Sequence, residues 1–103
     1  MEHLPIFLSV RDQICAVIGG GEIATRKVSL LLRAGARVRI IAPQLCANLS
    51  TLHDQDRVTH LARGYQDGDL DNAYLAIAAT DDADVNRAVA DAGRARNIPV
   101  NVV

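Results

Sequence analysis

Residues 14–24 read Ile14-Cys15-Ala16-Val17-Ile18-Gly19-Gly20-Gly21-Glu22-Ile23-Ala24, and this stretch decides the fold. An apolar segment rich in β-branched residues runs directly into a Gly-x-Gly-x-x-Ala pattern, and a segment with helical spacing of apolar residues follows. Such a turn brings bare backbone N–H groups to the start of a helix, where the helix dipole favours a diphosphate. The pattern therefore predicts a strand, a dinucleotide-binding turn and a helix, in preference to a tight turn without a ligand.

Small residues set the geometry of this turn. Gly19 is predicted to make the tight turn, Gly21 to let phosphates approach the main chain, and Ala24 to let the helix lie close to the strand. An Asp or Glu about twenty residues beyond the glycines usually bonds the ribose. Here the second predicted strand ends in Ile41-Ala42-Pro43-Gln44, without a carboxylate. Either backbone groups and Gln44 hold the ribose, or the ligand is a different one. The lack of a basic cluster for a 2′-phosphate favours NAD over NADP.

The composition fits one compact domain with an aliphatic core. Of the 103 residues, 50% are hydrophobic but only 3% are aromatic, which suits a parallel sheet buried on both faces. The formal net charge of −1 and the lack of a basic cluster argue against nucleic-acid binding. No apolar stretch is long enough to span a membrane, and the first residues do not resemble a secretion signal, so we expect a cytoplasmic protein.

The two cysteines and three histidines do not suggest a metal site. Cys15 lies inside the first predicted strand of residues 14–18, where a free thiol serves as a small core residue. Cys46 has no histidine or second cysteine nearby in the sequence. The histidines show no metal-ligand spacing with each other or with the cysteines. No metal site is therefore expected.

The rest of the chain alternates between predicted strands and helices. Gly35 is expected to end the first helix, and a loop anchored by Tyr65 and Leu70 is expected over residues 64–72. This alternation predicts an α/β domain with a doubly wound, Rossmann-like parallel sheet and helices on both faces. The predicted strands cover residues 4–10, 14–18, 37–42, 57–62, 74–79 and 98–103, and the predicted helices cover residues 22–34, 44–53 and 83–96.

Carboxylates gather where the fourth strand of the main sheet is predicted to end. Asp82 and Asp84 are interpreted as an N-cap and a first-turn charge for the helix that follows. For Asp81, contact with a coenzyme and helix capping remain equally open.

Five motifs stand in order along the chain: Met1-Glu2-His3-Leu4-Pro5-Ile6-Phe7, Val17-Ile18-Gly19-Gly20-Gly21-Glu22-Ile23-Ala24-x-Arg26-Lys27, Ala34-Gly35-Ala36, Leu75-Ala76-Ile77-Ala78-Ala79-Thr80-Asp81-Asp82 and Asn101-Val102-Val103. Together they resemble the N-terminal domain of siroheme synthase over the whole chain. The resemblance implies the NAD-binding part of a precorrin-2 dehydrogenase and sirohydrochlorin ferrochelatase. Many members of that family also carry a C-terminal uroporphyrinogen-III methyltransferase.

The resemblance also implies which residues hold NAD. Glu22 and Ile23 would sit where the diphosphate crosses the start of the helix. Pro43 and Gln44 would lie beside the adenosine, and the dipeptide Thr80-Asp81 would face the nicotinamide half. The family thus manages without the ribose carboxylate.

The family pattern continues beyond Asn101-Val102-Val103 into an aspartate taken to act in dehydrogenation and chelation, so the catalytic residues are not assigned. We expect residues 1–103 to be a single NAD-binding domain of a longer enzyme, inactive alone. The full-length enzyme would act on the tetrapyrroles precorrin-2 and sirohydrochlorin and would form a homodimer. The alternative is a nucleotide-sensing regulatory module without catalysis, although such modules ordinarily carry an acidic residue after the second strand.

Overall fold

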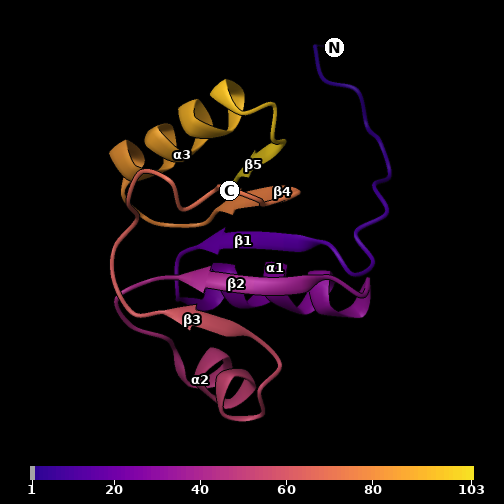
Figure 1. The fold of residues 1–103 in the computed structure, drawn as a ribbon. Helices are drawn as coiled ribbons and strands as arrows, with labels where there is room; N and C mark the ends of the chain where they lie inside the picture. The colour runs from indigo at the N-terminus through magenta and orange to yellow at the C-terminus, as the bar shows by residue number, and fades with distance from the viewer. Residues whose placement is uncertain (1) are drawn as a thin grey trace.

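The computed structural model describes residues 2–103, in which a central sheet separates two layers of helix and loop (Figure 1). Every pairing between neighbouring strands is parallel, and the order across the sheet is β3-β2-β1-β4-β5. The doubly wound, Rossmann-like fold predicted from the sequence is confirmed. The elements are β1 (Ile14–Ile18), α1 (Glu22–Arg33), β2 (Arg37–Ile41), α2 (Ala47–Asp54), β3 (Thr59–Leu61), β4 (Leu75–Ala78), α3 (Ala83–Ala95) and β5 (Val100–Val102).

The central strands are apolar on both faces because each face packs against its own core. Successive residues of a strand point to opposite faces. Val17 of β1 belongs to a cluster with Val28 of α1, on the face that α1 and α2 cover. Ile18 belongs to a second cluster with Val89 of α3 and with Leu70 from the loop before β4. Helices therefore cover both faces, as predicted.

The connection from β3 to β4, residues 62–74, contains turns and no helix. Asp69 organises it: this carboxylate accepts hydrogen bonds from Arg63 at 2.7 and 2.8 Å and from the backbone N–H of Gln66 at 2.7 Å. Arg39 of β2 donates to the carbonyl oxygen of Asp69 at 3.0 Å. The hydrogen bonds from Arg63 are the main reason that the pKa of Asp69 is lowered. These contacts explain how a segment rich in Gly and Asp forms a defined loop.

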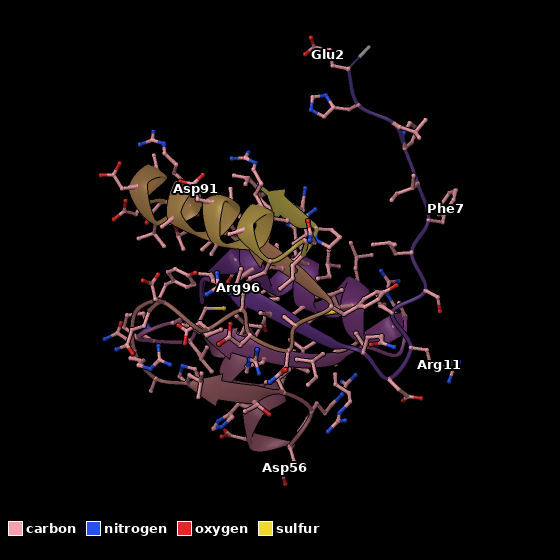
Figure 2. The ribbon with its side chains drawn as sticks, turned by 45° about the horizontal axis from the view of Figure 1, so that its top comes forward. Glu2, Phe7, Arg11, Asp56, Asp91 and Arg96 are labelled. Atoms are coloured by element: carbon pink, nitrogen blue, oxygen red, sulfur yellow. The ribbon has the colours of Figure 1, made fainter. Side chains whose placement is uncertain are left out.

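The structure does not contain the leading strand predicted over residues 4–10. This segment pairs with no strand and runs outside the sheet (Figure 1). A turn at residues 11–13 leads it into β1, which already has β2 and β4 on its two edges, so no hairpin can form. Pro5 also lacks the N–H that a strand ladder needs. Phe7 is fully exposed and points away from the sheet (Figure 2).

Other boundaries differ from the prediction by a few residues. Gly35 ends the first helix as predicted, with φ of +86° and with the N–H of Ala36 donating to the carbonyl of Leu31 at 3.0 Å. The second helix begins at Ala47 and not at residue 44. The residues before it form a loop that crosses the glycine turn, where the N–H of Cys46 donates to the carbonyl of Gly20 at 2.8 Å.

Candidate dinucleotide-binding site

A cleft of about 690 Å³ opens at the carboxyl ends of β1, β2 and β4. From β1 the chain adds β2 and then β3 along one edge of β1, and it then crosses back to place β4 and β5 along the other edge. Open α/β sheets bind ligands at such a switch point. The cleft is lined by residues 18–23, 41–44, 64–65 and 79–82 and by Val85.

The first two glycines fix the turn in place. Gly19 has φ of +131°, and a Cβ at this position would overlap the carbonyl oxygen of Ala79 at the end of β4. A Cβ on Gly20 would overlap the carbonyl oxygen of Gln44 in the β2–α2 loop. The glycine turn is therefore wedged between the ends of two strands, and only glycine fits at either position.

Gly21 has a different environment, because apart from its own atoms and its two chain neighbours no atom lies within 4 Å of the position that a Cβ would take. It is the N-cap residue of α1 and provides no side-chain hydrogen bond. The first hydrogen bond of this helix runs from the N–H of Thr25 to the carbonyl of Gly21 at 3.0 Å. The N–H groups of Glu22, Ile23 and Ala24 therefore have no acceptor within the helix. Free N–H groups at the positive end of a helix dipole, beside an open glycine, fit the diphosphate of a dinucleotide.

The other helix that begins at the cleft is capped by its own sequence. The carboxylate of Asp82 accepts from the N–H of Asp84 at 2.9 Å and from the N–H of Val85 at 3.3 Å. The interpretation of Asp82 as the N-cap of α3 is confirmed. Asp84 is exposed and pairs with Arg87 at 3.3 Å. Since the Asp82 carboxylate already occupies the start of α3 and adds a negative charge there, the start of α1 is the better place in the cleft for an anionic group.

The turn between β4 and α3 forms the wall opposite the β2–α2 loop. Asn86 of α3 holds this turn, because its side chain makes three hydrogen bonds with Thr80. Asp81 is exposed at the cleft, and no hydrogen bond or ion pair joins its side chain to the rest of residues 2–103. Thr80 and Asp81 thus differ sharply in what they can offer a ligand.

The structure brings the predicted site residues together. Ala24 alone does not line the cleft. It is fully buried in the cluster that α1 forms with the sheet, where it allows the close helix–strand packing predicted for it. That these residues hold the coenzyme stays a prediction. The predicted residues that line the cleft are Gly19, Gly21, Glu22, Ile23, Pro43, Gln44, Thr80 and Asp81.

The sequence did not identify Gly64, Tyr65 and Val85 as lining residues. Tyr65 was expected only to anchor its loop, and it does pack against the core cluster on the α3 side. Its buried hydroxyl has no hydrogen-bond partner among residues 2–103, and burial raises the pKa of this phenol. A lone aromatic residue in a loop of Gly and Asp was the available signal, but its place at the cleft depends on how the loop folds.

The wall of the cleft at the end of β2 has no carboxylate. Its wall is the stretch of residues 41–44, in which Gln44 is exposed. His60 Nε2 donates to the carbonyl oxygen of Ala42 at 2.7 Å and thereby fixes the backbone there. Backbone groups and the Gln44 amide are thus the polar groups that this wall can offer to a ribose.

Residues 2–103 hold neither a metal-binding cluster nor a membrane-spanning helix. No group of three or more His, Cys, Asp or Glu side chains in this range is arranged to hold a metal ion. No helix in the same range has the length and apolar character needed to cross a membrane.

Comparisons with known proteins identify the family of this chain. A family model described as "Putative NAD(P)-binding" matches residues 6–103. The siroheme synthases of Methylobacillus flagellatus and Chromobacterium violaceum are 56% and 52% identical to the whole chain, which covers 22% of each relative. The chain thus spans about a fifth of the length of these curated relatives.

A solved structure described as SirC, precorrin-2 dehydrogenase, superposes with a TM-score of 0.82 and 26% identity. The match covers 96% of this chain and 48% of that one. The uncapped start of α1, the open glycine and these matches lead to one conclusion. The chain belongs to the NAD(P)-binding family, as a counterpart of the N-terminal domain of siroheme synthase with NAD as its cofactor.

Proposed function

We propose that the chain is the coenzyme-binding domain of an enzyme that oxidises precorrin-2 to sirohydrochlorin with NAD and inserts ferrous iron into the product. The observation that carries this proposal is the uncapped start of α1 beside Gly21, since it provides free N–H groups for a diphosphate in the cleft at the switch point. The relatives named siroheme synthase and the structural match to a precorrin-2 dehydrogenase support the choice of substrate.

The residues of the cleft have separate binding roles in this proposal. The main-chain N–H groups of Glu22 and Ile23 hold the diphosphate. Pro43 and Gln44 border the adenosine, and the β4–α3 turn borders the nicotinamide half, because the two halves of a dinucleotide lie on opposite sides of the switch point. Bound NAD supplies the hydride acceptor.

The remaining chemistry needs groups that we assign to the rest of a longer protein. Oxidation of the macrocycle requires a base that accepts a proton as the hydride leaves, and iron insertion requires a group that accepts the pyrrole protons. We propose that an aspartate outside residues 1–103 serves here, as the resemblance implies. We propose that residues 1–103 bind NAD but do not turn over precorrin-2, and that further segments provide dimerisation and the tetrapyrrole site of a cytoplasmic homodimer.

A chimeric protein tests this proposal. Residues 1–103 replace the matching 103 residues of the Methylobacillus flagellatus siroheme synthase, and NADH formation from NAD and precorrin-2 is followed by absorbance. We expect turnover by the chimera and none by the 103-residue chain, although both bind NAD. Turnover by the chain alone would refute its inactivity. A folded chimera that binds NAD but forms no NADH would refute the assignment to precorrin-2 oxidation.

A further inference from the structure

One amide side chain controls the turn between β4 and α3. Asn86 Nδ2 donates to the carbonyl oxygen of Thr80 at 3.0 Å, and Asn86 Oδ1 accepts from the Thr80 hydroxyl at 2.7 Å. The backbone N–H of Thr80 also points to this oxygen, at 3.3 Å. All the polar groups of Thr80 are therefore engaged by a residue that lies six positions further along the chain, in the first turn of α3.

This arrangement leaves Thr80 with little to offer a ligand. Its hydroxyl has one proton, which goes to Asn86 at 2.7 Å or to the carbonyl oxygen of Asp82 at 3.0 Å, and its oxygen also accepts from the N–H of Asp82 at 3.2 Å. A ligand that took this hydroxyl would have to break the hydrogen bonds that hold the turn. Thr80 therefore lines the cleft without providing a polar contact to the ligand.

Asp81 is the neighbouring residue with free polar groups. It lines the cleft, and its exposed carboxylate has no hydrogen-bond or ion-pair partner within the described part of the chain. Asn86 holds the backbone that leads into Asp81, because it donates to the Thr80 carbonyl of the peptide that joins the two residues and accepts from the Thr80 N–H of the peptide before it. Asn86 itself is not among the residues that line the cleft.

We propose that Asn86 is a positioning residue for NAD: it fixes the Thr80 peptide so that Asp81 presents its carboxylate to the nicotinamide half. Carboxylate oxygens accept hydrogen bonds from ribose hydroxyls, and a negative charge at this wall favours the positively charged ring of NAD over the neutral ring of NADH. The inference rests on the proposed function, since it requires the nicotinamide half to lie beside the β4–α3 turn.

Calorimetric titrations of the 103-residue chain with NAD, NADH and ADP test the proposal. ADP contains the adenosine and the diphosphate but not the nicotinamide half. We expect Asp81→Ala and Asn86→Ala each to weaken NAD binding about tenfold, which is the loss of one hydrogen bond to a charged group, with ADP binding unchanged. Asp81→Asn should reduce the preference for NAD over NADH. Asn86→Asp keeps the acceptor for Thr80 and should restore part of the affinity.

The double variant with Asp81→Ala and Asn86→Ala separates positioning from a second, independent contact. It should bind NAD no more weakly than Asp81→Ala alone, because Asn86 acts through Asp81. The matched control is Asn48→Ala, at an exposed asparagine of α2 without a hydrogen bond to other described residues, and it should leave all three affinities unchanged.

Several results would overturn the proposal. Equal losses for ADP and NAD in Asn86→Ala would reveal a merely structural role, and additive losses in the double variant would reveal a separate contact. Asp81 is exposed, so Asp81→Ala should fold normally, and unchanged NAD affinity in that variant would refute the proposal even if Asn86→Ala did not fold. If the unmodified chain bound neither ADP nor NAD, the proposed function itself would be refuted.

Discussion

Gly21→Ala separates ligand binding from folding at the glycine turn. Gly21 has φ of −101° and ψ of −162°, which is extended backbone that alanine also adopts, and nothing lies within 4 Å of the new methyl group. Alanine is a poorer N-cap residue than glycine, but it also stabilises the protein by about 0.4–1 kcal/mol because it reduces the conformational entropy of the unfolded chain. We therefore expect the free energy of unfolding to change by less than about 1 kcal/mol, and Tm by less than about 8 °C.

The effect on binding should be much larger. The new methyl group extends into the open space at the start of α1 that the proposal assigns to the diphosphate, so a diphosphate cannot approach as closely. A hydrogen bond to a charged group contributes about 1.5–3 kcal/mol, so the loss of one such bond weakens binding about 10- to 150-fold. ADP and NAD should be affected equally, because both carry the diphosphate.

Calorimetric titration with ADP and NAD, together with thermal unfolding, measures both effects. Gly19→Ala provides the contrast: its Cβ would overlap the Ala79 carbonyl at a positive φ, so stability should fall together with affinity. Ser29→Ala, at an exposed position further along α1, is the control and should change neither quantity. If folded Gly21→Ala bound ADP as tightly as the unmodified chain, the start of α1 could not be where the diphosphate is held.

Three further predictions concern stability and reactivity. Because the folded state lowers the pKa of Asp69 below its ordinary value of 3.8, the stabilisation is present above that pH and is lost as the pH falls through the folded value. Asp69→Asn should thus lower the free energy of unfolding by about 1–3 kcal/mol at neutral pH. The difference in stability between the variant and the unmodified chain should shrink in acid, and a difference that grew in acid would contradict this. Burial raises the pKa of the Cys15 thiol, so an alkylating reagent should label Cys46 before Cys15 in the folded protein. Peptide mass spectrometry measures the two labelling rates, and equal rates would argue against the buried position of Cys15. A Cβ on Gly93 would overlap Val100, so Gly93→Ala should destabilise the protein by about 1–3 kcal/mol in denaturant unfolding. Val100→Ala should then cost less in the Gly93→Ala background than in the unmodified chain, and strict additivity would refute the overlap.

The sequence predicted those parts of the fold that depend on local patterns. The strand, glycine turn and helix over residues 14–24 were recognisable because their spacing reflects burial and backbone geometry at the same residues. The cap at Asp82 was recognisable for a similar reason, because a cap depends only on the residues that directly follow it. Gly35 was recognisable as the end of its helix because a positive φ at that position favours glycine.

Features that depend on distant partners could not be read in this way. Residues 4–10 have the apolar content of a strand, but pairing requires a free edge, and β1 has β2 and β4 on its two edges. Tyr65 reaches the cleft only because Asp69, paired with Arg63, shapes its loop. The hydrogen bonds between Thr80 and Asn86 join the end of a strand to the first turn of the next helix, and no sequence motif predicts them.

A crystal structure of the chain with bound NAD tests the central claim most directly, through the contacts of the diphosphate oxygens. We expect these oxygens to lie within hydrogen-bonding distance of the main-chain N–H groups of Glu22 and Ile23, next to the bare Cα of Gly21. A diphosphate bound elsewhere, with the N–H groups at the start of α1 facing only water, would contradict the claim.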